Sequence, residues 1–288
     1  MSTCWVIYNG SLTSDKFSDQ AELLRDAAER AGVAAVAKKN YEVLMDLQAE
    51  PVDLPDFVVF LDKDILLATY LKQLGVPIFN DPDVIETCDN KAKQYLELAR
   101  HGIPMPKTII APKVYPAFTI RESGYYEKVL AELGLPMVIK EGHGSFGMKV
   151  YLVETKEQFF EKTDALRGVD YVFQEFIASS RGRDIRVNIV GNEIVAAMAR
   201  TSETDFRANI TNGGTATPVE LTSAQRQLAL RAAKAVGAKF AGVDLLYGED
   251  GGPLVCEVNA AAHIRNIYNV TGINVADAMI AYILRKLP

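Results

Sequence analysis

The hairpin-like segment 241–259 carries three oxygen-bearing side chains that suit a metal ion. An Asp-Gly pair at 250–251, a strong hairpin signal, separates its two strand-like runs. If that pair centres the turn, Asp244 lies opposite Glu257, and Asn259 points to the same face because side chains alternate along a strand. Carboxylates about 5 Å apart repel by roughly 3 kcal/mol at an effective dielectric of about 20, so their pairing needs a reason. Oxygen ligands favour Mg²⁺ carrying a nucleotide phosphate, and a solvated hairpin with scattered acids is the alternative.

A glycine-rich loop is the second feature that could bind a ligand. Residues 142–147 read Gly-His-Gly-Ser-Phe-Gly after an apolar strand that ends at Lys140. A dinucleotide fingerprint requires a helix next, whereas 149–153 is a strand pattern, and a Walker loop requires Lys-Ser or Lys-Thr. These contexts exclude both motifs and leave a hairpin loop folding over phosphates, or a flexible turn. Lys140, at the end of that strand, could reach such a phosphate, and a solvated lysine is the alternative. Lys91 lies in the first turn of a helix, where the dipole disfavours a cation, and this conflict favours a functional role for Lys91.

Positive charge is concentrated in the middle of the chain. Arginines surround Asp184, and a Gly-Asn turn at 191–192 predicts a hairpin that places Asp184 and Arg186 on one face. Guanidinium groups suit phosphates and carboxylates, so the sequence indicates a polyanion pocket, with a salt-bridged surface as the alternative. The arginines concerned are Arg181, Arg183, Arg186, Arg200 and Arg207.

Composition narrows the class of protein. The chain has 288 residues, 49% of them hydrophobic and 24% charged, as in an ordinary globular protein. Its net charge of −6 argues against an electrostatic nucleic-acid binder. Three widely spaced cysteines form no zinc or redox motif, no leader pattern is present, and apolar runs such as 57–61 are too short to span a membrane. We therefore expect a cytoplasmic protein without nucleic-acid or membrane partners.

The elements expected to position these residues alternate in type. The first part of the chain predicts βα alternation and hence a small parallel sheet, with strands at 4–8, 57–61 and 76–79 and helices at 18–31 and 64–74. Later helices are expected at 89–101, at 156–166 after Thr155, at 223–236 after Thr222, and after Asn274. The predicted fold class is α+β, beginning with a small α/β unit.

Taken together, these motifs resemble the ATP-grasp superfamily, specifically its RimK-like carboxylate–amine ligases. The resemblance covers about 76–288 and depends on the order and spacing of many short motifs. They are Asn90-Lys91, Gly102-Ile103-Pro104-Met105-Pro106-Lys107-Thr108, Val138-Ile139-Lys140 with the glycine loop, Gln174-Glu175-Phe176-Ile177, Asp184-Ile185-Arg186, Asp205-Phe206-Arg207-Ala208-Asn209, Gly242-Val243-Asp244 and Glu257-Val258-Asn259-Ala260.

The resemblance implies an ATP-grasp fold in three parts. An amino-terminal α/β domain, 1–85, would precede a central subdomain with the glycine loop, 86–175, and a carboxyl-terminal subdomain with the metal site, 176–288. The two α+β subdomains would clasp ATP and two Mg²⁺ ions, which Mn²⁺ can replace.

The resemblance also implies a role for each site residue. Arg200 and Arg207 would be catalytic, stabilising the transferring phosphoryl group. Asp184 would serve the ribose side, and Glu175 and Phe176 would form the adenine hinge through their backbone. The residues placed near phosphate are Lys91, Lys140, Gly144, Ser145, Gly147 and Asn209, and the metal ligands are Asp244, Glu257 and Asn259.

The implied reaction is ATP-dependent amide formation. A carboxylate attacks the γ-phosphate to give an acylphosphate, and an amine then displaces phosphate. The acceptor would be a small molecule, peptide or protein, and the amine an amino acid with glutamate as a candidate; a homo-oligomer is left open. The alternatives are a ligase that adds glutamate to a cofactor tail and a nucleotide-binding regulatory protein without turnover.

Two positions depart from the family pattern. Lys149 stands where the loop pattern has a further glycine. The stretch 260–265 reads Ala-Ala-Ala-His-Ile-Arg where the family commonly has Ala-Ser-Pro-Gly. Because this stretch borders the implied substrate cavity, the departure offers His263 and Arg265 as new partners for a carboxylate.

Overall fold

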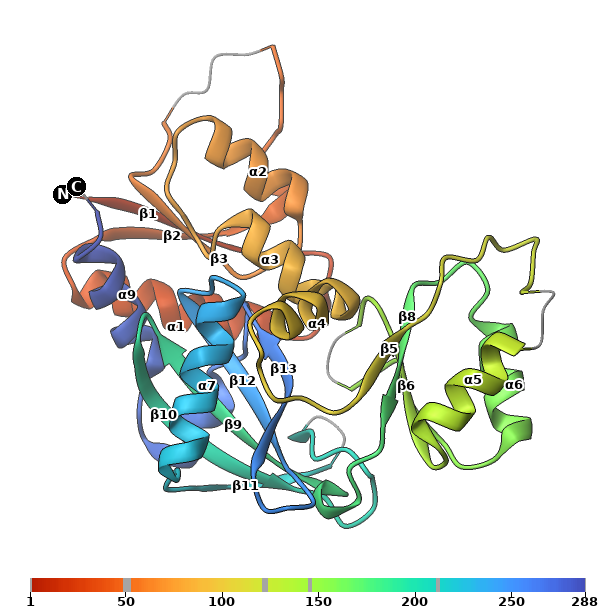
Figure 1. Cartoon of the computed structure of the whole chain (residues 1–288). Coiled ribbons are helices and arrows are strands. Elements are labelled where there is room, and N and C mark those ends of the chain that lie inside the picture. The colour runs from red at the N-terminus through yellow and green to blue at the C-terminus, as the bar shows by residue number, and fades with distance from the viewer. Residues whose placement is uncertain (1, 49–52, 121–123, 145–146, 211–212, 288) are drawn as a thin grey trace.

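The computed structural model describes residues 2–48, 53–120, 124–144, 147–210 and 213–287, and contains three sheets. Figure 1 shows the first and third sheets close together, with the second set to one side of them. The first is parallel, in the order β2-β1-β3-β4, with Cys4 of β1 level with Ala34 of β2 and Phe57 of β3. Its elements are β1 (Thr3–Tyr8), β2 (Ala34–Lys39), β3 (Phe57–Phe60), β4 (Ile78–Phe79), α1 (Lys16–Arg30) and α2 (Ile65–Gln73). The predicted α/β unit is therefore confirmed, and β2 is an additional edge strand.

The second sheet is antiparallel, in the order β5-β8-β6-β7. Its core is formed by aromatic and aliphatic side chains of its own strands and helices, including Phe159 stacked on Phe173 with 5.4 Å between ring centroids. The elements are β5 (Thr108–Ile110), α5 (Gly124–Leu133), β6 (Met137–Glu141), β7 (Val150–Val153), α6 (Lys156–Ala165) and β8 (Tyr171–Glu175). β6 and β7 form the hairpin that holds the glycine loop.

The third sheet has five strands in the order β11-β10-β9-β12-β13. Its elements are β9 (Arg183–Val190), β10 (Glu193–Thr201), β11 (Thr215–Pro218), α7 (Ser223–Ala235), β12 (Phe240–Tyr247), β13 (Pro253–Asn259), α8 (Arg265–Thr271) and α9 (Val275–Leu284). Ile185, Val187 and Ile189 of β9 face the core under α7. Alternation along β9 therefore turns Asp184 and Arg186 to the opposite face, as predicted.

The predicted helix 89–101 is confirmed as α4 (Lys91–Arg100), and an additional helix that was not predicted, α3 (Pro82–Asp89), directly precedes it. Asn90 separates them in an extended conformation, with φ −100° and ψ 109°, and its side chain accepts a hydrogen bond from the Lys93 amide. An asparagine that caps one helix ends the preceding one because its backbone leaves the helical region. The start of α4 is therefore fixed at Lys91.

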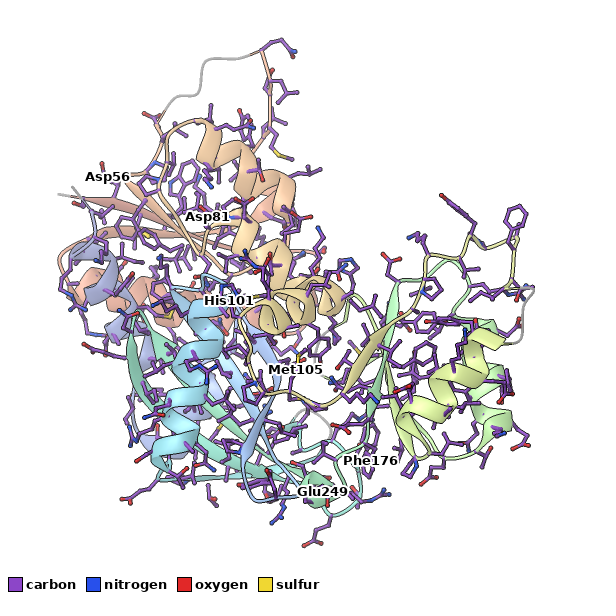
Figure 2. All side chains as sticks on the ribbon, in the orientation of Figure 1. Asp56, Asp81, His101, Met105, Phe176 and Glu249 are labelled. Carbon is purple, nitrogen blue, oxygen red and sulfur yellow. The ribbon has the colours of Figure 1, made fainter. Side chains whose placement is uncertain are left out.

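The three sheets fall within the stretches 1–85, 86–175 and 176–288, and the boundaries between those parts remain a prediction. One hydrophobic core joins α1 of the first sheet to α9 and β10, through side chains that include Leu24, Met198 and Ile280. Met105 lies where the chain passes from α4 into the second sheet, and Phe176, just after β8, lies where it leaves the second sheet for the third (Figure 2).

No single helix among the described residues is long and apolar enough to cross a membrane. Helices α8 and α9, bent by 116° at the break between them, pass the test of length and composition only as a pair. In this structure Val275, Met279, Ile280 and Ile283 of α9 are buried in the protein core.

Candidate functional site

The predicted pairing of Asp244 with Glu257 is confirmed, but the turn differs from the one expected. Strand pairing resumes at Tyr247 with Pro253, so the connection is longer than a two-residue turn centred on 250–251. The register then shifts between Asp244 and Leu245, where Cys256 is an extra residue on β13. This bulge compensates for the longer connection and restores the expected opposition of the two carboxylates.

The glycine loop docks on the junction between α3 and α4. The Lys91 amide donates to the Gly142 carbonyl at 2.9 Å, and Lys91 Nζ donates to the Gly144 carbonyl at 3.2 Å. His143 Nδ1 lies 2.9 Å from Asp89 Oδ2. These contacts bring the loop, predicted to cover phosphates, over the lysine predicted to contact them. Ser145, assigned to the same loop, lies outside the described residues.

Lys91 and Lys140 are both buried, with 6% and 5% of their surface exposed. Lys140 Nζ donates to the Tyr95 hydroxyl at 2.9 Å. Burial lowers the pKa of Lys91, and the nearby Glu257 carboxylate opposes that shift in part. A phosphate placed between the two ammonium groups would favour their charged forms.

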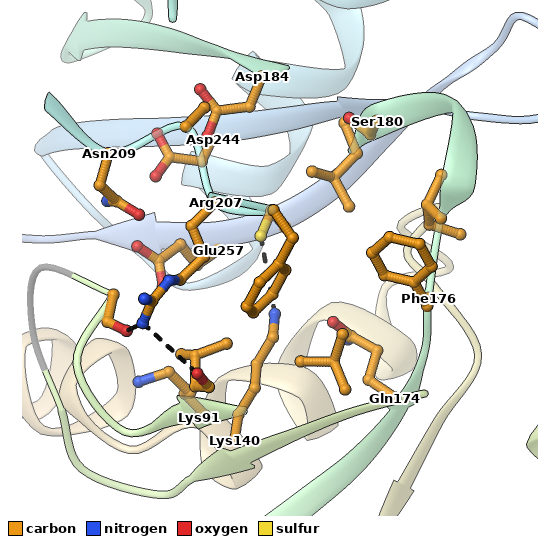
Figure 3. A pocket seen from close by; sticks show the side chains of 18 of the residues that line it. Lys91, Lys140, Gln174, Phe176, Ser180, Asp184, Arg207, Asn209, Asp244 and Glu257 are labelled. Carbon is orange, nitrogen blue, oxygen red and sulfur yellow. Dashed lines mark hydrogen bonds between the residues drawn. The ribbon is translucent and has the colours of Figure 1, made fainter. Parts of the chain in front are cut away.

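A cavity opens above these lysines, between the second and third sheets (Figure 3). Gln174 and Phe176 stand at one end, and Asp184, Asp244 and Asn209 lie across from the lysines. Apolar side chains at this cavity, among them Val138, Leu246 and Ile177, suit the face of a purine. The Glu175 carboxylate accepts a hydrogen bond of 2.7 Å from the Lys107 amide, so its side chain is held by the protein.

Arg207 links the third sheet's loops to the glycine loop. Its Nε and Nη2 donate to both carboxylate oxygens of Asp205, at 2.9 and 2.7 Å. Its Nη1 donates at 2.5 Å to the carbonyl of Gly147, which lies in the loop between β6 and β7. The guanidinium therefore ties the glycine loop to the third sheet at the edge of the cavity that both residues line.

A buried network of two arginines and two aspartates forms the wall behind the cavity. Arg200 donates to Asp184 at 2.7 and 2.6 Å and approaches Asp244 to 3.0 Å, while Arg186 Nη2 donates to Asp244 at 2.7 Å. Burial alone would raise the pKa of Asp244, but the two arginines outweigh it and lower the pKa to about 2. The charges balance within the network, which a buried set of ions requires.

Close packing in this wall depends on a glycine. A Cβ added to Gly242 would lie 2.5 Å from the Ala262 Cβ and 3.1 Å from Arg186 Cδ and Nη1. The missing side chain therefore leaves the space that Arg186 occupies beside Asp244.

Glu257 and Asn259 of β13 lie together on the cavity face of the hairpin. Asn259 Nδ2 donates to Glu257 Oε1 at 3.0 Å, and Asp244 is level with Glu257 on β12. The described residues contain no group of three or more His, Cys, Asp or Glu arranged for a metal. The predicted set is instead two carboxylates and an amide, donor types that suit a hard divalent cation. In this structure both oxygens of Asp244 accept from Arg186, and one of them lies 3.0 Å from Arg200. The metal assignment remains a prediction.

A second cavity adjoins the first and shares Met148, Asn209 and Glu257 with it. Loops of the first sheet contribute to this cavity, together with Arg186, Arg200 and the stretch 260–265. Sequence reasoning missed the amino-terminal contributors, including Asn9 and Asp62. Both follow strands of a parallel sheet, and the carboxyl ends of such strands are where ligands bind, so the rule could have found them.

The stretch 260–265, whose sequence departs from the family pattern, is held by contacts with α1. Arg265 forms a two-pronged ion pair with Asp19, at 2.7 and 2.6 Å, and His263 packs edge-on against Phe17 with 5.2 Å between ring centroids. Burial, followed by the positive charges of Lys16 and Arg186, lowers the pKa of His263 to about 4. The imidazole is therefore neutral at pH 7, and both side chains lie at the second cavity.

Known proteins with similar sequences and folds are consistent with this geometry. A family model described as a RimK-like ATP-grasp domain matches residues 88–283. The chain is 33% identical over 243 residues to N-acetylaspartylglutamate synthase A of Homo sapiens, with 82% of this chain and 60% of the relative covered. It is 37% identical over 217 residues to the probable alpha-L-glutamate ligase of Enterobacter sp. (strain 638), with 74% and 69% covered. This chain therefore spans less than two thirds of the human relative's length.

Among solved structures, the ATP-grasp ligase PsnB, complexed with a phosphomimetic variant of its minimal precursor, Mg and ADP, has a similar fold. The TM-score is 0.73 at 16% identity, with 99% of this chain and 98% of that chain covered. The predicted fold class and ligase class are confirmed, and ATP is the nucleotide that ATP-grasp ligases use. Because the family model matches residues 88–283 and the cavity lies between the two sheets of that region, the chain belongs to the RimK-like ATP-grasp family.

Proposed function

We propose that this ligase activates a carboxylate as an acylphosphate at the expense of ATP and joins it to the amine of an amino acid. Two relatives are named as glutamate ligase and N-acetylaspartylglutamate synthase, which makes glutamate the leading candidate for the amine. The acceptor is a small-molecule, peptide or protein carboxylate. A cofactor-tail ligase is included in this class, whereas the names of these relatives give no support to a regulator without turnover.

The observation that carries the proposal is that the two cavities adjoin and share lining residues. Glu257 and Asn209 border both of them, so a nucleotide lying along the first would present its terminal phosphate to a substrate in the second. Phosphoryl transfer depends mainly on positioning and charge stabilisation. A site built from lysines, arginines and oxygen ligands, without a histidine-centred triad, suits that requirement.

In this proposal each predicted site residue keeps its role. Lys91, Lys140 and the backbone of Gly144 and Gly147 hold the phosphates, and Asn209 lies beside them. Glu175 and Phe176 hold the adenine through their backbone, and Asp184 serves the ribose side.

The proposed ligands of two magnesium ions, which Mn²⁺ can replace, are Asp244, Glu257 and Asn259. When bound, such ions supply charge neutralisation at the phosphates. Arg207 lines the first cavity and Arg200 the second, and Arg186 donates to Asp244 at 2.7 Å.

Substitution of Glu257 by glutamine tests the proposal. We expect the variant to lose amide formation by about 100-fold or more, because the proposed cation loses an anionic ligand and neutralises the developing phosphate charge less well. The assay reads ADP release and product mass together, with Mg-ATP, L-glutamate and a panel of carboxylates and short peptides. The control is Glu249→Gln, in the turn of the same hairpin, where the carboxylate accepts a hydrogen bond of 3.2 Å from the Ser179 amide. Unchanged turnover in Glu257→Gln would remove the metal assignment.

A further inference from the structure

Asp62 is a buried carboxylate at the second cavity, and its cationic neighbour Lys63 pairs with Asp89. It is 7% exposed and lies just beyond β3, at the carboxyl end of the parallel sheet. The neighbouring cavity acids Asp19 and Asp89 form ion pairs with Arg265 and Lys63. Burial raises the pKa of Asp62, and the Lys63 backbone, the Asn9 amide and the Lys63 charge offset only part of that rise.

Asn9 orients this carboxylate. Its Nδ2 donates to Asp62 Oδ1 and Oδ2, at 3.2 and 3.1 Å. Its Oδ1 accepts the Ser11 amide at 3.0 Å and the Ser11 hydroxyl at 2.5 Å, which fixes which end of the amide faces Asp62. A carboxylate has about four acceptor positions, so acceptor capacity remains after the contacts with Asn9 and the Lys63 backbone. The pair is therefore preorganised to receive a donor from the cavity.

We propose that Asp62, held by Asn9, is the subsite that receives the ammonium group of the amine substrate. The inference rests on the proposed function, because a ligase of this class must bring an amine to a cavity that also borders the phosphates. Glu257 borders the same cavity from the side of the nucleotide site. A cationic group between Asp62 and Glu257 would stabilise a buried carboxylate whose charge Lys63 offsets only in part.

The subsite predicts a preference for amino acids over their desamino analogues. Protein saturated with Mg²⁺ and the non-hydrolysable analogue AMPPNP is titrated with each of the twenty amino acids and with the matching desamino acid, such as L-glutamate and glutarate. We expect the preferred amino acid to bind about tenfold or more tightly than its analogue, since hydrogen bonds to charged groups are the strong ones. In Asp62→Asn, which keeps the shape and an acceptor for Asn9, the preference should fall below about twofold.

Asp19→Asn is the matched control, because Asp19 is another acid at this cavity but is neutralised by Arg265. It should change the binding of amino acid and analogue together and keep the preference. A preference that survives in Asp62→Asn overturns the subsite, and so does the absence of any preference in the unmodified protein. Failure of AMPPNP to bind at all would instead contradict the proposed function.

Discussion

Lys140 shows how a single residue reveals the site. Lys140 is 5% exposed, and its ammonium group donates to the neutral Tyr95 hydroxyl and lies 3.7 Å from Cys256 Sγ. Burial disfavours its charged form, whereas these neighbours and the Glu257 carboxylate favour that form and raise the pKa of Lys140. A buried cation at a cavity is a candidate for binding an anionic ligand, here a phosphate.

The Lys140→Met variant should weaken AMPPNP binding about tenfold or more, because a charge-assisted hydrogen bond to phosphate is lost. It should not lower the melting temperature of the unliganded protein, since methionine fills a similar volume without a buried charge. Isothermal titration and thermal unfolding measure the two effects. Lys149→Met, at a lysine whose side chain is 53% exposed, is the control. Affinity equal to that of the unmodified protein would count against a phosphate contact.

Lys149 is the residue at which the family's glycine is missing, and the structure explains the family's choice. Its φ is +65°, in the left-handed region that favours glycine. We expect Lys149→Gly to be more stable than Lys149→Ala by about 1 kcal/mol, because both lose the ion pair with Glu141 but only glycine relieves the backbone strain. Urea denaturation of the two variants gives this difference directly. Equal stability would mean that the loop adopts another conformation.

At the scale of elements, the sequence predicted the features that depend on neighbouring residues, such as helix caps. The caps Thr155, Thr222 and Asn274 begin helices as expected, since their side chains bond to amides two or three residues ahead. The edge strands β2 and β11 and the short α8 were not predicted, because a short segment forms only where the folded protein offers it a partner. The hairpin register was predicted, but the bulge at Cys256 was not, because it depends on the packing of both strand faces.

The two caps Asn90 and Thr222 should respond differently to substitution by alanine. Each should cost about 1 kcal/mol of unfolding free energy, since each side chain satisfies an amide in the first turn of its helix. Only Asn90→Ala should also weaken AMPPNP binding, because Asn90 Nδ2 lies 3.3 Å from His143 Nε2 on the glycine loop. Chemical denaturation and titration of both variants test this. An equal effect on nucleotide affinity would mean that α4 does not position the loop.

At the scale of the molecule, the second sheet has a core of its own and meets the third across the nucleotide cavity. Arg207 and the contacts of Lys91 with the glycine loop bridge the two sides at the rim. The order of motifs predicted the clasp. The sequence did not predict the contribution of the first sheet to the second cavity, because Asn9 and Asp62 approach Ala262 and His263 only through contacts between distant parts of the chain.

Nucleotide binding should therefore stabilise both sides of the clasp together. AMPPNP with Mg²⁺ at about 100 times its dissociation constant should add about 2.7 kcal/mol to the unfolding free energy. Hydrogen exchange should slow in the backbone of the glycine loop 142–144 and in the loop 205–209, which lie on opposite sides. Glu257→Gln should reduce the effect of Mg²⁺ on this protection. Protection confined to one side would contradict a clasp.

The core shared by α1 and α9 has a consequence for folding during synthesis. Leu24 and Ala28 of α1 are buried by a cluster that includes Ile280 and Ile283, and Arg30 pairs with Asp277 at 2.5 Å. During synthesis the first sheet emerges from the ribosome long before the helix that completes its cover. The part of the α1 face that α9 covers therefore completes its packing only after α9 has been translated.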